Sequence, residues 1–247
     1  MNHKVQTVLH TSIKPGRCHE SRRQTRRHHF RRTTLAVMAL LLFCLCLGGC
    51  IRTFDCSGYI QGMLDATYKG ECDDYAAATH SEVSDIMQDY NDFIAHETDI
   101  FLHFCGLTAD DVIPEDLTQQ LTGDLQDIYR QVRYTVNEAD RDGNVTVDIE
   151  PLDLYNSVYE EFSEFNEAFR ERNNNYEFEE FSDEEFTREY LEPLLTILEE
   201  HKDHLTFREP ITVTVKVAPD EDGRYTISNE EVTQLYNTII NYTIDSI

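Results

Sequence analysis

The sequence predicts an α+β fold, in which helices pack on a small antiparallel sheet of about four strands in two hairpins, after an N-terminal signal segment. Between residues 55 and 247 most apolar residues recur at spacings of three, four or seven, as in amphipathic helices. Two stretches, Val145–Ile149 and Ile211–Val217, alternate apolar and polar residues instead, as half-buried strands do. An Asp-Gly pair adjoins each stretch and favours a hairpin turn. Hairpins exclude a doubly wound parallel sheet.

An apolar run near the N-terminus predicts where the protein resides. Residues 1–34 are rich in Arg and His, and the thirteen apolar residues 35–47 follow them. This layout is typical of a secretory signal, and the run is too short for a membrane span, which needs about 20 residues. The run ends in Leu47-Gly48-Gly49-Cys50, which resembles a bacterial lipobox, where a lipoprotein is lipidated on its cysteine and cleaved. An ordinary cleaved signal or a buried helix is the alternative.

These boundaries predict the organisation of the whole chain. We expect residues 1–49 to be a lipoprotein signal peptide and Cys50 to carry lipid, palmitate among its acyl chains. Residues 50–54 would form a short linker, and residues 55–247 a single extracytoplasmic domain on the cell membrane.

The apolar spacing and the capping residues predict seven helices. Gly70 and Gly106 are helix-ending glycines, and Pro114 suits a first turn. Ser182 with Glu185, and Ser228 with Glu231, have the spacing of capping boxes. The expected helices are Asp55–Lys69, Cys72–Thr79, Ser81–Cys105, Pro114–Ile128, Leu154–Phe169, Ser182–His204 and Ser228–Tyr242.

Period-two alternation predicts the strands. Arg133–Glu138 and Val145–Glu150 would form one hairpin, with Asp142-Gly143 in its turn. Ile211–Val217 would pair with the short strand Tyr225–Ile227 across a second Asp-Gly turn.

The charge of the predicted mature chain limits its partners. Residues 50–247 contain 46 acidic and 12 basic residues, a net charge near −34 with His neutral. Such a surface repels nucleic acid and anionic lipid headgroups, so we expect no nucleic-acid partner. It would attract a cation or a basic protein. The alternative is that the acidic residues form solvated helix faces that keep the domain soluble.

Three groups of residues are candidate metal ligands, each with a plainer explanation. His201 and His204, beside Glu199, Glu200 and Asp203, could face one metal, but His also suits a helix C-terminus. His96, His103 and Cys105 could bind zinc or be surface histidines near an unrelated thiol. The run Asp140–Asn144 suggests a calcium loop, but its glycine falls at the fourth position, whereas an EF-hand needs glycine at the sixth. Strand residues follow instead of a helix, so a hairpin is favoured. We expect no cofactor.

The cysteines of the mature part do not predict a disulfide framework. Cys56, Cys72 and Cys105 follow Cys50, and three is an odd number. Cys56 and Cys72 stand near opposite ends of a helix about 21 Å long, beyond the reach of a disulfide.

Several short motifs resemble a group of uncharacterised lipoproteins from Gram-positive Firmicutes. They are Tyr59-Ile60-Gln61-Gly62, Tyr68-Lys69-Gly70, Asp74-Tyr75, Arg133-Tyr134-Thr135-Val136 and Val145–Asp153. The resemblance covers most of the mature chain and implies no established activity. It also implies a likeness to cystatin-like or NTF2-like helix-plus-sheet domains.

No catalytic signature accompanies the predicted anchor. The sequence lacks the G-x-S-x-G, P-loop and G-x-G-x-x-G patterns. The first hypothesis is therefore a non-enzymatic, membrane-anchored domain that binds a ligand or a protein. The second is a cell-envelope hydrolase that uses acidic residues or His201 and His204. The third is the substrate-binding component of a transporter, although that class usually has two parallel α/β lobes.

Overall fold

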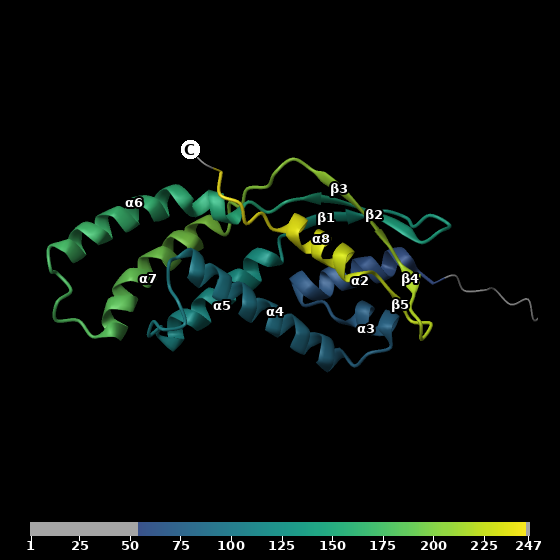
Figure 1. Ribbon diagram of the computed structural model, residues 1–247, viewed down its shortest axis with the longest axis horizontal. Coiled ribbons are helices and arrows are strands. Elements are labelled where there is room, and N and C mark those ends of the chain that lie inside the picture. The colour runs from purple at the N-terminus through teal and green to yellow at the C-terminus, as the bar shows by residue number, and fades with distance from the viewer. Residues whose placement is uncertain (1–53, 246–247) are drawn as a thin grey trace, which may run out of the picture. The chain divides into compact units, whose positions relative to one another are not determined.

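The computed structural model describes residues 54–245, so the predicted signal peptide and Cys50 lie outside the described residues. Seven helices occur in the described range: α2 (Cys56–Lys69), α3 (Asp73–Thr79), α4 (Val83–Phe104), α5 (Glu115–Tyr129), α6 (Leu154–Asn174), α7 (Asp183–His201) and α8 (Asn229–Ile239). The strands are β1 (Arg133–Val136), β2 (Asn144–Glu150), β3 (Ile211–Lys216), β4 (Ala218–Pro219) and β5 (Tyr225–Thr226). The predicted α+β class is confirmed (Figure 1).

Local capping chemistry places several helix ends at or next to the predicted positions. The side chain of Asp55 accepts a hydrogen bond from the Gly58 amide at 2.8 Å and begins α2. Gly70, with φ of 70°, ends it in the left-handed conformation that glycine adopts without strain. Both predicted capping boxes are present, at Ser182 before α7 and at Ser228 before α8.

The pairing of β3 differs from the prediction. β3 pairs antiparallel with β2, giving a three-stranded sheet in the order β1-β2-β3, and the second Asp-Gly turn joins β4 to β5. The register sets Val145 opposite Val215 and Val147 opposite Val213, so the apolar faces of both strands are buried together. The two residues of β5 are too few to bury the apolar face of β3.

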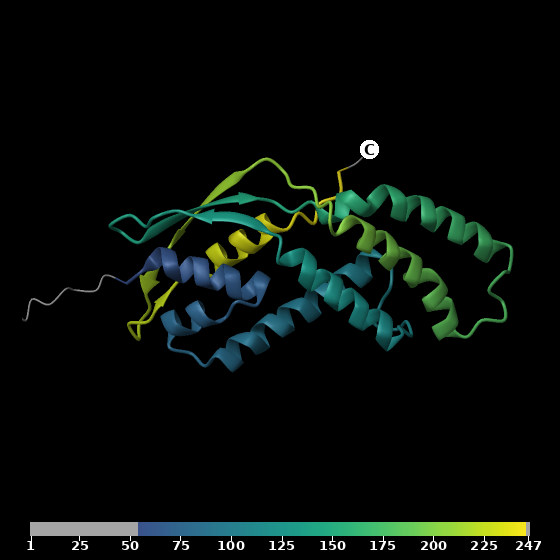
Figure 2. The same cartoon turned by 180° about the vertical axis from the view of Figure 1, so that it is seen from behind.

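The helices cover one face of the sheet and then continue beyond it. α2 and α8 pack on the three-stranded sheet, and α4 and α5 pack beside α2. α7 packs against α5 on one side and against α6 on the other. Leu121, Leu125 and Ile128 of α5 are fully buried, because α5 lies between the sheet-covering helices and α7. Figure 2 shows the same arrangement from behind, with the α6–α7 pair projecting away from the sheet.

The two ends of the segment that carries α6 and α7 lie together. Leu152 and Phe207 form an antiparallel bridge, and the amide of Asp153 donates to the carbonyl of Thr206 at 3.0 Å. The segment 153–206, which connects β2 to β3 in the sequence, therefore begins and ends at neighbouring positions beside the sheet.

The small β4–β5 hairpin lies against the start of α2. The rings of Phe54 and Tyr225 stack with their centroids 4.0 Å apart and their planes 1° apart. This contact joins the beginning of the described chain to its C-terminal quarter.

Candidate ligand-binding pocket

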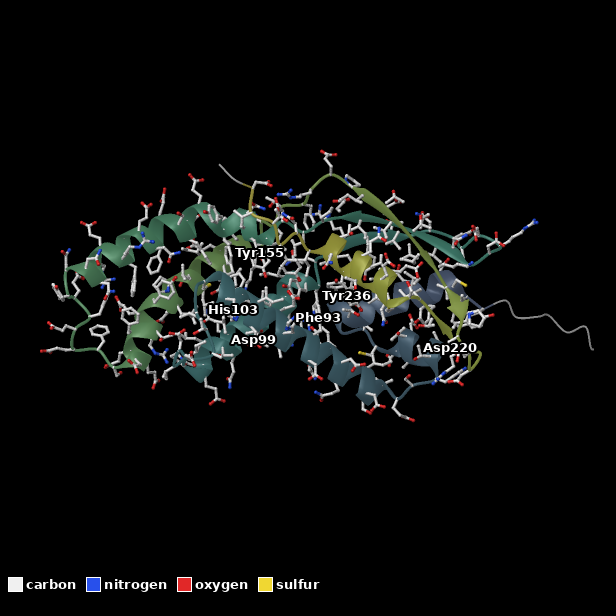
Figure 3. All side chains as sticks on the ribbon, viewed as in Figure 1. Phe93, Asp99, His103, Tyr155, Asp220 and Tyr236 are labelled. Atoms are coloured by element: carbon white, nitrogen blue, oxygen red, sulfur yellow. The ribbon has the colours of Figure 1, made fainter. Side chains whose placement is uncertain are left out.

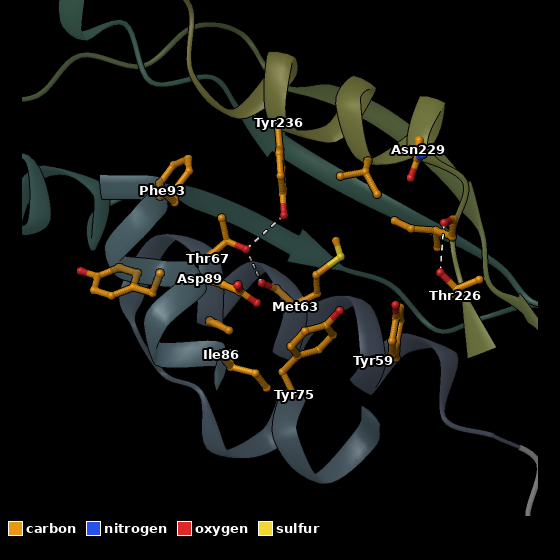
Figure 4. A pocket seen from close by; sticks show the side chains of 14 residues that line it. Tyr59, Met63, Thr67, Tyr75, Ile86, Asp89, Phe93, Thr226, Asn229 and Tyr236 are labelled. Carbon is orange, nitrogen blue, oxygen red and sulfur yellow. Dashed lines mark hydrogen bonds between the residues drawn. The ribbon is translucent and has the colours of Figure 1, made fainter. Parts of the chain in front are cut away.

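A pocket of about 370 Å³ lies between α2, α3, α4 and α8, beside β5 (Figure 4). We call it the aromatic pocket, because five of its side chains are aromatic rings. It is lined by Tyr59, Met63, Ala66, Thr67, Tyr75, Ile86, Asp89, Tyr90, Phe93, Thr226, Ile227, Asn229, Val232 and Tyr236.

Helical spacing and one glycine bring these walls together. Tyr59, Met63 and Thr67 are four residues apart and so share one face of α2. α3 approaches α2 closely at Gly62, where a Cβ atom would lie 3.0 Å from the backbone nitrogen of Tyr75. The lack of a side chain at Gly62 therefore lets Tyr75 reach the pocket, where its ring centroid is 5.5 Å from that of Tyr59.

A chain of two hydrogen bonds fixes the ring of Tyr236 across the pocket. The hydroxyl of Thr67 donates its one proton to the carbonyl of Met63 at 2.9 Å. The hydroxyl of Tyr236 lies 3.1 Å from the Thr67 oxygen, so Tyr236 is the donor in that contact. α8 is thereby connected to α2 through a polar contact within an otherwise apolar wall (Figure 4).

The pocket carries a single negative charge. Among its described lining residues only Asp89 is charged at neutral pH, and none of residues 54–245 forms an ion pair or a hydrogen bond with its carboxylate. Burial raises the pKa of Tyr75 well above its ordinary value, and the neighbouring Tyr59 and the charge of Asp89 add to the shift. Burial raises the pKa of Tyr236, the hydrogen bond with Thr67 opposes that shift in part, and Tyr59 and Asp89 add to it. Both phenols are therefore neutral in the physiological range.

The candidate metal ligands are not gathered into a cluster. His201 Nε2 lies 2.9 Å from a Glu161 oxygen. α7 ends at His201, so His204, which was expected on the same helix, lies beyond it and is exposed. Cys105 is buried, which raises the pKa of its thiol to about 12, whereas His96 and His103 are exposed on α4. Within residues 54–245 no group of three or more His, Cys, Asp or Glu side chains is placed to hold a metal ion.

The predicted hairpin turn at Asp142-Gly143 is confirmed. The Asp140 carboxylate accepts hydrogen bonds from the amides of Asp142 and Asn144 at 2.8 and 2.9 Å, and from the Asn144 side chain at 2.7 Å. These bonds lower the pKa of Asp140. Gly143 has φ of 82°, as a turn glycine does. The carboxylate therefore serves the turn itself.

The described cysteines are buried thiols. Cys56, Cys72 and Cys105 are all free in residues 54–245. Burial raises the pKa of each, so all three are protonated and poorly reactive at neutral pH.

A buried carboxyl group joins three parts of the chain away from the pocket. Glu97 of α4 is 3% exposed and accepts a hydrogen bond from the Tyr129 hydroxyl of α5 at 2.6 Å. The Tyr242 hydroxyl, beyond α8, reaches both of its oxygens at 2.8 and 2.9 Å. Burial raises the pKa of Glu97, and the two phenol hydrogen bonds oppose that shift only in part.

Sequence reasoning assigned several of the pocket residues to the core. Tyr59, Met63, Tyr90 and Val232 follow the apolar helix spacing that predicts buried faces. The occurrence of Tyr instead of Phe at such positions was the one indication of a pocket wall, because a phenol hydroxyl needs a polar neighbour or solvent. Asp89 had no such signal, since acidic residues are frequent throughout this sequence.

The fold and the pocket define an α+β domain with an open aromatic cavity that bears one negative charge. No family model matches the sequence, and no curated protein matches it either. A solved structure of a candidate lipoprotein, ycdA, from Bacillus subtilis subsp. subtilis str. 168 is similar, with a TM-score of 0.49 and 15% sequence identity. The similarity covers 76% of this chain and 56% of that one, so this chain matches just over half of that protein's length. The comparisons give no support to the expected likeness to cystatin-like or NTF2-like domains.

Proposed function

We propose that this protein is a membrane-anchored extracytoplasmic lipoprotein, without catalytic activity, that binds a small ligand in the aromatic pocket. The observation that carries the proposal is the pocket itself. Its volume of about 370 Å³ falls within the range of small-molecule sites, about 300–1,000 Å³. Its walls are mainly apolar and aromatic with a few polar groups, which is the usual composition of such sites.

The lining of the pocket supports binding rather than hydrolysis. The described lining residues include no Ser, Cys, His or Lys, the side chains that most often act as nucleophile or general base. Asp89 is the one carboxylate there, so the two-carboxylate arrangement of a glycosidase cannot be built from these side chains. A cell-envelope hydrolase acting at this pocket is therefore the weaker alternative.

The arrangement of strands argues against the transporter alternative. Substrate-binding components usually have two α/β lobes with parallel strands, whereas the strand pairs within residues 54–245 are antiparallel.

The anchor part of the proposal is supported by the sequence. Leu47-Gly48-Gly49-Cys50 has the layout of a lipobox, and the motifs that resemble Firmicutes lipoproteins agree with that assignment. None of the helices in residues 54–245 combines the length and apolar content that a bilayer span requires. Stable attachment through Cys50 would need more than one acyl chain, because a single chain binds a membrane only marginally.

A neutral probe tests whether the aromatic pocket binds a small apolar molecule. In the full chain with ¹³C-labelled methionine methyl groups, 3,3-dimethylbutan-1-ol should shift the Met63 resonance in a saturable way, because Met63 lines the pocket. Val232→Phe should weaken this binding by filling part of the pocket. Gln234→Phe is the matched control, since it adds the same ring at an exposed position of α8.

The proposal of a ligand site fails if the Met63 resonance responds only in a linear, unsaturable way both to this alcohol and to a probe of the same shape that carries a charge. It also fails if the Val232 and Gln234 variants bind the probe equally, because the response would then come from elsewhere on the protein.

A further inference from the structure

We infer that the aromatic pocket binds an organic ammonium ion, with Asp89 and the surrounding rings as its recognition elements. This inference rests on the proposed function and adds the chemical class of the ligand. Three features of the pocket support it: an unpaired carboxylate, aromatic rings contributed by several helices, and the lack of a second charged group among the described lining residues.

The carboxylate is available to a ligand. Asp89 stands on the exposed side of α4 at the wall of the pocket, and no described side chain pairs with it. Its carboxylate is one of the groups that line the pocket, together with Tyr75 and Tyr236. A cation in the pocket would be attracted by the same charge, whereas an anion would be repelled.

The rings supply the second element of recognition. Tyr59 of α2, Tyr75 of α3, Phe93 of α4 and Tyr236 of α8 all line the pocket, so a bound group would have aromatic neighbours on several sides (Figure 4). A cation within about 6 Å of a ring centroid is attracted by the negative face of the ring. This attraction is larger for a weakly hydrated alkylammonium group, which can be desolvated in the pocket, than for a compact metal ion.

The same residues disfavour an inorganic cation. Calcium takes six to eight oxygen ligands and magnesium demands near-octahedral oxygen coordination. Within the described chain, Asp89 contributes the one carboxylate of the pocket, and no cluster of metal-ligating side chains surrounds it. An ammonium group with apolar substituents instead matches one carboxylate, several rings and the thioether of Met63.

Two probes of equal shape separate charge from size. Choline and 3,3-dimethylbutan-1-ol differ chiefly in the positive nitrogen that replaces a quaternary carbon. With the full chain and the Met63 methyl resonance as readout, choline should bind at least about tenfold more tightly than the alcohol. Asp89→Asn should remove most of this preference. Asp99→Asn, on the same helix but outside the pocket lining, makes the same change in net charge and should preserve it (Figure 3).

The ring contribution has its own variants. Tyr75→Leu should weaken the binding of choline more than that of the neutral alcohol, because leucine keeps apolar volume but has no π-electron face. Tyr75→Phe keeps the ring and should keep most of the preference for choline. Melting temperatures of both variants near that of the parent chain would establish that they fold.

The outcomes distinguish this inference from the proposed function. Equal affinities for choline and the alcohol would overturn the ammonium assignment and leave the pocket as a site for neutral ligands. A preference for choline that Asp99→Asn removes as fully as Asp89→Asn would also overturn it, because general electrostatic attraction would then account for binding. Saturable binding of neither probe would refute both the ammonium assignment and the ligand site.

Discussion

The hydroxyl of Tyr242 offers a test of how the C-terminal segment is held against the helices. Replacing Tyr242 by Phe removes one of the two phenols that donate to the buried Glu97 carboxyl and leaves Tyr129 in place. The ring of Tyr242 packs against that of Tyr155, with centroids 5.5 Å apart, and Phe can keep that contact. The substitution therefore isolates the hydrogen bond.

The size of the effect depends on the charge of Glu97. A hydrogen bond between neutral groups contributes about 1 kcal/mol to the free energy of unfolding, and one to a charged group about 1.5–3 kcal/mol. Because Tyr242 is 39% exposed, we expect the lower part of the second range. The loss in the Phe variant should be about 1 kcal/mol where Glu97 is protonated and about 2 kcal/mol where it is ionised.

The pH dependence follows from the raised pKa of Glu97. A carboxyl group with a raised pKa binds its proton more tightly in the folded state than in the unfolded state. Its contribution to stability is therefore full below the unfolded pKa and is lost as the pH rises through the folded pKa. Tyr242→Phe removes a donor that favours the ionised form, so it raises the pKa of Glu97 further. The stability difference between variant and parent should grow with pH.

Urea unfolding of the full chain, followed by far-ultraviolet circular dichroism at pH 5 and pH 8, measures this difference. Comparing variant with parent at each pH cancels the titration of the other carboxylates. Tyr225→Phe is the control, because Tyr225 has the same 39% exposure and its hydroxyl has no hydrogen-bond partner within residues 54–245. A loss for Tyr242→Phe that is equal at both pH values, or no larger than the loss for Tyr225→Phe, would refute the reasoning.

Three further predictions concern the anchor, the surface charge and one turn. Cys50→Ala should abolish labelling by an alkyne analogue of palmitate, whereas Cys56→Ala, at a buried thiol, should not; label retained without Cys50 contradicts the lipobox. Raising NaCl from about 0.01 to about 1 M should raise the melting temperature, since the Debye length falls from about 30 to about 3 Å and carboxylate repulsion weakens; an unchanged value contradicts this. Gly143→Ala should cost roughly 1–3 kcal/mol more than Gly223→Ala in urea unfolding. Both glycines have positive φ, but only at Gly143 would a Cβ lie 2.5 Å from a carbonyl oxygen, that of Val217; equal losses would count against this clash.

Features set by neighbouring residues could be predicted from the sequence. The capping boxes at Ser182 and Ser228 involve residues three positions apart, and the left-handed conformations of Gly70 at a helix end and Gly143 in a turn require only glycine's own freedom. Each needs no knowledge of distant parts of the chain. Most helices of the described range therefore begin and end near their predicted positions, whereas α6 continues to Asn174, beyond the predicted end at Phe169.

The partner of β3 could not be predicted in the same way. The nearby Asp222-Gly223 turn favoured pairing with Tyr225–Ile227, whereas the observed partner β2 is separated from β3 by residues 151–210. Alternation shows which face of a strand is buried but not which strand lies beside it. The burial of Val213 and Val215 against β2 decided the pairing.

The pocket could not be predicted either, because its walls come from elements that are distant in the sequence. Tyr59, Tyr75, Asp89 and Tyr236 come from four helices, and nothing in their local sequence shows that α8 returns to α2. Helical spacing identified Tyr59 as facing inward but could not separate a pocket wall from a packed core. Asp89 can be recognised as a candidate site residue only from its position beside the aromatic rings of the pocket.

The closed ends of residues 153–206 have a consequence for the order of folding. Pairing β2 with β3 directly from an unfolded chain would require closing a long loop, at an entropic cost that grows with the logarithm of its length. Once α6 and α7 have formed and packed as a hairpin, Leu152 and Phe207 are already neighbours. The chain that must still be ordered to pair β2 with β3 is then only the few residues between this bridge and each strand. The preformed helical hairpin would thus hold the ends of β2 and β3 close together before they pair. Mutations that weaken the packing of α6 on α7 should therefore slow the formation of the sheet, even though they lie far from it.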